Sequence, residues 1–400
     1  MTPLPEGTSA DDFAFLHRAT MTRAALLRRT LVGAISLSAA APLLSACGDD
    51  DGDSDSGAAS VDPSKASGSL ALLVWQGYDD KNAAKPLSEK GVKISAQYVA
   101  NNDEFITKLR GGGEGKFDIV TPYHGYLEAL YAADLIQPLD YSKLPSTKSY
   151  LPEFAKAEFN RFDGEIYSAP LVWGDTPMVY RTDLVEKPPE SWLDLRKPEW
   201  KDRVVMWDDG FGHILLFSKV LFGSEAPNEI NREQLDEVIA TLGEIKKNAV
   251  TVAPSHGDVA DILTRGDGEI ATESWAFVAA QVNSKGKPAK THLPKEGAFA
   301  WADSYAIPKG APNLDAAYAF INTMVSPRGD SIVGGATSSG VTSEGAIERL
   351  PADQQKLYPY DDLAGYFDRL GFYGIPPLEP EGDITTLKDW NAAWEEFKAA

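Results

Sequence analysis

The sequence predicts an α/β fold, because apolar segments of strand length alternate with segments of helical periodicity. The 400 residues suffice for two or three domains of ordinary size, and the 43% of hydrophobic residues suits globular cores. Residues 70–75 form a continuous apolar run, which is typical of a strand buried on both faces. The alternation of the two kinds of segment indicates βαβ units and a mostly parallel sheet.

The predicted elements follow one another along the whole chain after residue 70. Strand patterns occur at 70–75, 91–100, 117–121, 167–180, 203–207, 269–275 and 298–308. Helical spacing or caps occur at 102–110, 126–133, 214–222, 232–247, 258–264, 314–325 and 384–398. We expect Pro327 to close the helix that precedes it, because proline interrupts a helix.

The N-terminal residues have the pattern of an export signal. From Met21, a second possible start, basic residues come first, an apolar run follows at 31–44, and small residues precede Cys47. The apolar run is short and rich in Ala and Ser, which argues against a transmembrane anchor. We therefore expect residues 1–46 to be a signal segment.

Cys47 is the only cysteine, so no intrachain disulfide can form. The residues 44–47, Leu-Ser-Ala-Cys, resemble the lipobox of bacterial lipoproteins, in which the cysteine is lipidated and becomes the first mature residue. The pair Arg28-Arg29 resembles a twin-arginine signal. Residues 47–69 are rich in Asp, Ser and Gly, which predicts a lipidated Cys47 and a flexible acidic tether.

Composition and motifs exclude several classes of function. The formal charge of −21 disfavours nucleic acid and anionic lipid as partners. The five histidines lack the spacing of metal ligands, and the glycine-rich segment 111–116 lacks the residues of a phosphate-binding loop. We expect no enzyme activity, cofactor or metal. A secreted hydrolase remains an alternative, because paired carboxylates can come from distant parts of a chain.

The segment 298–308 combines three side chains that can hold an organic cation. Trp301, Asp303 and Tyr305 lie two residues apart, so on a strand they project from one face. The rings offer their negative faces and the carboxylate offers the opposite charge. The alternative is a half-buried strand whose rings belong to the core and whose Asp is solvated.

Four blocks taken together resemble the spermidine/putrescine-binding proteins of bacterial ABC importers. The blocks are residues 72–80, residues 117–145, residues 167–185 together with 191–209, and residues 294–322. The resemblance extends from about Leu70 to the C-terminus. It implies a type II-like, two-lobed periplasmic-binding-protein fold, in which each lobe is a mixed sheet flanked by helices and the ligand cleft lies between them. It further implies one lobe from 70–172 with 303–345, and another from 173–302 with 346–400.

The resemblance also implies a set of ligand-binding residues. In it Trp301 is a ring platform, while Asp209 and Asp303 hold ammonium groups. The whole set is Trp75, Tyr78, Tyr123, Tyr126, Asp209, Trp275, Trp301 and Asp303. Three family positions differ, since an acid and two rings are replaced here by Gly212, Gly125 and Gly340.

The expected function is that of an exported, lipid-anchored and monomeric receptor for a polyamine or related organic cation. The receptor would act in the periplasm or at the cell surface and deliver its ligand to the permease of an ABC transporter. Another small solute remains an alternative, such as an amino acid, a metal chelate, a phosphonate or a sugar acid. The matching blocks are poor in arginine, which counts against an anion.

Overall fold

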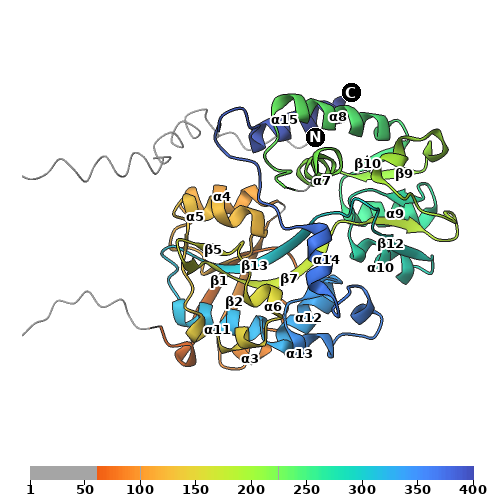
Figure 1. Ribbon diagram of the computed structural model, residues 1–400. Coiled ribbons are helices and arrows are strands. Elements are labelled where there is room, and N and C mark those ends of the chain that lie inside the picture. The colour runs from red at the N-terminus through yellow and green to blue at the C-terminus, as the bar shows by residue number, and fades with distance from the viewer. Residues whose placement is uncertain (1–60, 100, 224) are drawn as a thin grey trace, which may run out of the picture. The chain divides into compact units, whose positions relative to one another are not determined.

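Two mixed β-sheets organise the computed structural model, which describes residues 61–99, 101–223 and 225–400 (Figure 1). The seven strands of the first sheet are β1 (Ser69–Val74), β2 (Lys93–Tyr98), β3 (Ile119–Val120), β4 (Ile136–Gln137), β7 (Ser168–Asp175), β13 (Ala300–Pro308) and β14 (Gly340–Val341). The five strands of the second are β8 (Met178–Arg181), β9 (Val204–Trp207), β10 (Ala249–Ala253), β11 (Ile270–Ala271) and β12 (Ala289–His292). A separate hairpin pairs β5 (Arg161–Phe162) with β6 (Glu165–Ile166).

Both sheets combine parallel and antiparallel pairs. In the first, β1 is parallel to β2 and β3, whereas β13 is antiparallel to β3, β4 and β7. In the second, β9 is parallel to β10 and β11, whereas β8 is antiparallel to β11 and β12. The predicted α/β fold with mixed sheets is therefore confirmed, whereas the expectation of a mostly parallel sheet is wrong, because antiparallel pairs join β7, β13 and β14 in the first sheet and β8, β11 and β12 in the second.

Helices cover both faces of each sheet. Figure 1 shows α4 and α5 on one side of the first sheet and α3, α11 and α12 on the other, and it shows the second sheet between α7–α8 and α9–α10. The helices are α3 (Lys85–Ser88), α4 (Asp103–Arg110), α5 (Leu127–Ala132), α6 (Pro152–Ala155), α7 (Gly210–Phe222), α8 (Arg232–Lys246), α9 (His256–Arg265), α10 (Ala276–Ser284), α11 (Leu314–Met324), α12 (Pro327–Thr337), α13 (Glu344–Ile347), α14 (Leu363–Leu370) and α15 (Leu387–Ala399).

Local sequence explains where the longer helices begin. The side chain of Asn231 accepts a hydrogen bond from the Gln234 N–H, and the Gln234 side chain accepts one from the Asn231 N–H, so a capping box starts α8. Thr386 and Asp389 form the same motif at the start of α15. The buried face of α15 carries Trp390 and packs on α7 and α8. These contacts attach the C-terminal helix to the second lobe.

The chain passes between the sheets at three places. The first is at residues 176–177, between β7 and β8, and the second lies between β12 and β13. The third follows α14, where Ala300 pairs with Phe372. Lys219 of α7 donates hydrogen bonds to the carbonyls of Ala298 (2.5 Å), Arg369 (2.7 Å) and Leu370 (2.6 Å), which joins two of these crossings.

The sheet assignment differs from the predicted lobe boundaries. Residues 173–175 and 300–302 extend the first sheet, because β7 and β13 pair along almost their whole length. The segment 346–372 also lies with the first lobe, since Phe367 of α14 packs edge-on against the buried ring of Trp173. At the C-terminal end of the chain, α15 packs on α7 and α8 of the second lobe.

Three further expectations differ from the structure. Residues 61–68 are not part of a tether, because they pack on α11 and the Asp62 N–H donates to Asp315 at 2.7 Å. Pro327 starts α12 instead of only closing α11, because proline suits the first position of a helix capped by Ser326. The strand expected at 269–275 stops at Ala271, since Glu273 has a φ of 34° and the chain turns.

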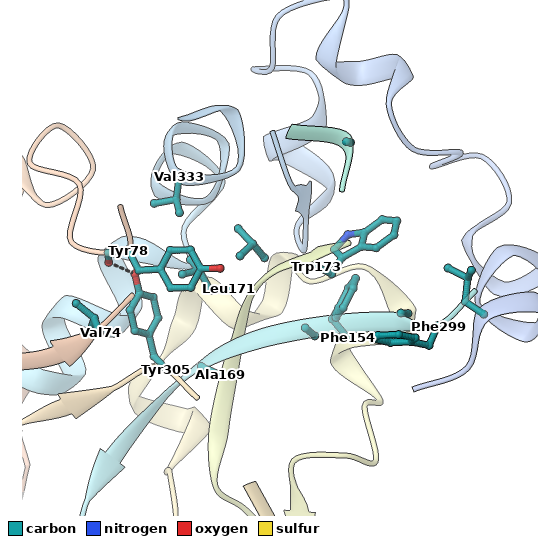
Figure 2. Packing of buried hydrophobic residues seen from close by; sticks show 14 of the residues in the cluster. Val74, Tyr78, Phe154, Ala169, Leu171, Trp173, Phe299, Tyr305 and Val333 are labelled. Carbon is teal, nitrogen blue, oxygen red and sulfur yellow. Dashed lines mark hydrogen bonds between the residues drawn. The ribbon is translucent and has the colours of Figure 1, made fainter. Parts of the chain in front are cut away.

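A buried cluster around β7 and β13 fixes the loop that follows β1. Figure 2 shows Tyr305 beside Tyr78, and the Tyr305 hydroxyl donates to the Tyr78 carbonyl at 2.6 Å. Trp173 and Phe154 belong to the same cluster, with ring centroids 6.2 Å apart. The face that carries Trp301 and Asp303 thus continues into the core at Tyr305, which is fully buried.

None of the helices described by the structure combines the length and apolar character needed to cross a bilayer. The predicted signal segment, the lipidation site Cys47 and most of the tether lie outside the described residues.

Candidate ligand-binding site

Asp303 lies on β13, the strand of the first sheet that follows the second crossing between the sheets. Its Oδ2 atom accepts a hydrogen bond from the Tyr78 hydroxyl at 2.5 Å, and the residue is 9% exposed. Burial raises the pKa of Asp303 to about 7, and the bond from Tyr78 partly opposes this shift. Among the ion pairs of the described residues, none joins Asp303 to a lysine or arginine. The carboxylate therefore lacks a cationic partner of its own.

The indole of Trp301 packs over Gly174 of the neighbouring strand β7. A Cβ atom at Gly174 would lie 2.4 Å from the Trp301 ring, so only glycine leaves room for the indole there. The indole N–H donates to the Asp175 carbonyl at 3.3 Å. The ring meets Trp275 edge to face, with centroids 5.4 Å apart.

Trp275 begins a row of aromatic side chains on the second lobe. The row continues through His256, 5.7 Å from Trp275, to Trp207, 3.8 Å from His256. Burial lowers the pKa of His256 to about 4, so this imidazole is neutral at pH 7. The first lobe's Trp301 and this row together form a continuous aromatic wall.

Tyr123 occupies a central position between the acidic groups of both lobes. It pairs with Asp303 through the backbone, and its ring lies 5.8 Å from Phe211 of α7. Burial, followed by the negative charges of Asp303, Asp209 and Glu273, raises the pKa of its hydroxyl well above the usual value. The three carboxyl groups therefore act electrostatically on one phenol, whose hydroxyl donates to the Tyr373 carbonyl at 2.9 Å.

Tyr126 and Trp75 lie at the edge of this region. The Tyr126 hydroxyl donates to Asp103 of α4 at 2.9 Å, so it is already engaged. Trp75 packs edge-on against Phe105, 6.0 Å away, and its indole nitrogen has no hydrogen-bond partner.

The adjacent acids Asp208 and Asp209 have different surroundings. Asp208 accepts hydrogen bonds from the Trp394 indole (2.7 Å) and from Lys398 (3.0 Å), which fasten α15 to the second sheet. Asp209 precedes α7 and is half-buried. Burial raises the pKa of Asp209 to about 6; the N–H groups of Gly212 and Phe211 oppose the shift, and the Asp208 charge adds to it.

Two further carboxyl groups were not predicted from the sequence. Asp175, at the end of β7, accepts a hydrogen bond from the Tyr366 hydroxyl at 2.5 Å, and burial raises its pKa to about 6. Glu273, in the turn after β11, is 1% exposed, and burial together with the Asp209 charge raises its pKa well above the usual value. The sequence position of Glu273, two residues before the predicted ligand-binding residue Trp275, is a signal that could have identified it.

The structure thus brings Tyr78, Tyr123, Trp275, Trp301 and Asp303 into direct or shared contact. Asp209 lies within electrostatic range of Tyr123. In the part of the chain that the structure describes, no cluster of three or more His, Cys, Asp or Glu side chains is arranged to hold a metal ion. Acidic groups beside aromatic rings suit an organic cation better than an anion.

Comparison with known proteins identifies the family. The model of the bacterial extracellular solute-binding proteins matches residues 82–338. The chain belongs to this family. It is therefore exported, and it is a solute-binding protein of the ABC-transporter type and not an enzyme.

Individual family members confirm the resemblance seen in the sequence. The spermidine/putrescine-binding periplasmic protein of Salmonella typhimurium is 30% identical over 243 residues, which cover 60% of this chain and 67% of that protein. The putrescine-binding periplasmic protein PotF of Escherichia coli is 30% identical over 274 residues, covering 64% and 73%. The structure of the spermidine/putrescine ABC transporter substrate-binding protein PotD from Streptococcus pneumoniae is 25% identical, with a TM-score of 0.65 and coverage of 82% and 97%. The fold is thus the two-lobed fold of this family's binding proteins.

Proposed function

We propose that this protein captures an organic cation of the polyamine class and delivers it to the permease of an ABC importer. The ligand lies between the two sheets, against Trp301, Trp275, Tyr78 and Tyr123. Asp303 and Asp209 hold its ammonium groups. Trp75 and Tyr126 contribute at the edge of the site.

The observation that carries the proposal is a pair of carboxyl groups, on buried Asp303 and half-buried Asp209, that form no ion pair with a lysine or arginine of the described residues. Burial raises the pKa of Asp303 to about 7 and that of Asp209 to about 6, which means that the protein's own groups compensate the charged forms poorly. An ammonium group supplies the missing charge and the missing hydrogen bonds. Each such charge-assisted hydrogen bond contributes about 1.5–3 kcal/mol.

The aromatic wall supports the same ligand class. Ring faces attract alkylammonium groups electrostatically, and they also cover the methylene chain between two amines. The names of the Salmonella and Escherichia relatives, which mention spermidine and putrescine, agree with this choice.

The location within the cell follows from the N-terminal pattern. We propose that Cys47 is lipidated and that residues 47–60 form the tether that links the lipid to the folded body. The body would act as a monomer. A Cys47→Ala variant is expected to leave the membrane fraction and appear in the soluble exported fraction, while ligand affinity is unchanged.

Calorimetric titration with spermidine, putrescine and choline tests the ligand class. A diamine or triamine should bind, and Asp303→Asn should weaken that binding. If no amine binds but an amino acid, metal chelate or sugar acid does, the receptor role stands and the ligand class is wrong.

A further inference from the structure

We infer that Glu273 is a ligand-binding residue that forms, together with Asp209, a two-carboxylate subsite for the second ammonium group of a diamine. The inference rests on the proposed cation-binding function. Glu273 lies in the turn between β11 and α10. Its carboxyl group takes the place of the acid that α7 lacks at Gly212.

Gly212 marks the place where the two carboxyl groups meet. A Cβ atom at Gly212 would lie 2.6 Å from Oδ2 of Asp209 and 2.6 Å from Oε1 of Glu273, so the two oxygens lie within twice that distance of each other. Any side chain at this position would displace one or both acids. The glycine therefore opens the space that the Glu273 carboxyl group occupies.

Glu273 is buried without the contacts that would explain it as a structural acid. It is 1% exposed, and its Oε2 atom has no hydrogen-bond partner among residues 61–99, 101–223 and 225–400. A buried polar group with no partner costs stability, and the backbone at φ 34° adds strain, since this region is unfavourable for residues with a Cβ. Uncompensated strain and burial at one residue are typical of a functional site.

The neighbouring imidazole does not neutralise Glu273. Nδ1 of His213 is 3.7 Å from Oε2 of Glu273, but the same nitrogen lies 2.9 Å from the Asp209 carbonyl, to which it must donate. Burial lowers the pKa of His213 to about 4, so the ring carries no charge at pH 7. Asp209, His213 and Tyr123 are the titratable groups that face Glu273 among the described residues, and none of them supplies a positive charge.

The arrangement suits a primary ammonium group. Such a group has three N–H donors, and Asp209 and Glu273 present acceptor oxygens from two sides. Asp303, across the phenol of Tyr123, is left for the other ammonium group of the same ligand. A monoamine can satisfy only one of these two ends.

The test compares putrescine with 1-butylamine, which has the same carbon chain and one ammonium group. Calorimetric titration of Glu273→Gln should show putrescine affinity reduced by about 10- to 100-fold and butylamine affinity changed by less than about 3-fold. Glu269→Gln removes the same charge four residues earlier, where the side chain pairs with Arg203 (2.7 Å), and should change neither affinity.

The outcomes separate the two proposals. If the wild-type protein binds neither amine, the proposed function fails. If it binds putrescine and Glu273→Gln binds it equally well, only the Glu273 subsite fails. If Glu273→Gln does not fold, the wild-type protein is titrated in buffers of different ionisation enthalpy, which measures the protons released on binding. Putrescine is expected to release more protons than butylamine near pH 6.5. Equal proton release by the two amines overturns the subsite.

Discussion

Two fully buried acids of this protein, Asp118 and Glu273, serve different purposes. Asp118 in the first lobe is 0% exposed, and it accepts hydrogen bonds from the N–H groups of Ala71 and Asn313, both at 2.8 Å. It therefore joins β1 to the start of α11. Glu273 in the second lobe is almost as deeply buried, but its Oε2 atom accepts no hydrogen bond from the part of the chain that the structure describes.

The difference separates structural acids from binding acids. The fold fills the acceptor capacity of Asp118 with its own donors, whereas it leaves Oε2 of Glu273 without a hydrogen-bond donor among the described residues. Open acceptor capacity in a buried place is costly unless a ligand fills it. We therefore expect the acids of the site to govern binding and pH dependence, and Asp118 to govern stability.

The pH dependence of stability should show the largest difference. The pKa of an isolated aspartate is about 3.9, but burial raises the pKa of Asp303 in the folded protein to about 7. Between about pH 4 and about pH 7, the folded state keeps this proton while the unfolded chain has lost it. The contribution of Asp303 to the free energy of unfolding therefore falls as the pH rises through this range. In denaturant unfolding, the free energy of unfolding should fall over this pH range by about 4 kcal/mol more in the wild type than in Asp303→Asn. Parallel pH profiles would contradict this assignment.

Asp118→Ala should have the next largest effect, on stability alone. The substitution leaves the N–H groups of Ala71 and Asn313 without their acceptor, which should lower the free energy of unfolding by about 3 kcal/mol. The remaining folded protein should bind putrescine with unchanged affinity. A loss of affinity without a loss of stability would reverse the distinction between the two acids.

Asp303→Asn should mainly affect binding. The loss of one charge-assisted contact should weaken putrescine binding by about 2 kcal/mol, or about 30-fold, in calorimetric titration at pH 7.5. Asp134→Asn is the matched control, because Asp134 is an exposed acid that pairs with Lys309. Equal affinities of the two variants would remove Asp303 from the site.

Trp301→Leu should have the smallest effect of the four. The ring-face attraction for an ammonium group contributes about 1 kcal/mol, so affinity should fall by about 5-fold while the variant still folds. Trp301→Phe should recover part of the loss, because it restores a ring face above Gly174. Undiminished affinity in Trp301→Leu would show that the indole is not a platform.

The sequence predicts the fold better than it predicts the full site. The buried strands at 70–75 and 203–207 are visible as apolar runs, and the helix at 232–247 as regular spacing, because local patterns determine them. The helices α10, α12 and α14 were not predicted. Pro327 predicts the end of a helix, but it also begins α12. The place of α14 depends on its contact with Trp173, which is distant in the sequence.

The site residues on one strand were accessible to sequence reasoning, whereas the acid pair was not. Trp301 and Asp303 share a face by simple alternation. Glu273 meets Asp209 only because the chain turns at Glu273 and because Gly212, far away in the sequence, leaves the space. The choice between Asp208 and Asp209 likewise depends on α15, whose Trp394 engages Asp208.

The most direct test of cation capture is thermal unfolding of the purified protein against putrescine, spermidine, 1-butylamine and a set of organic anions. A ligand at 100 times its Kd that binds only the folded state stabilises by about 2.7 kcal/mol, which is a visible shift in Tm. We predict a shift with the diamine and the triamine, a smaller one with the monoamine, and none with the anions. A shift with an anion and none with any amine would contradict the account.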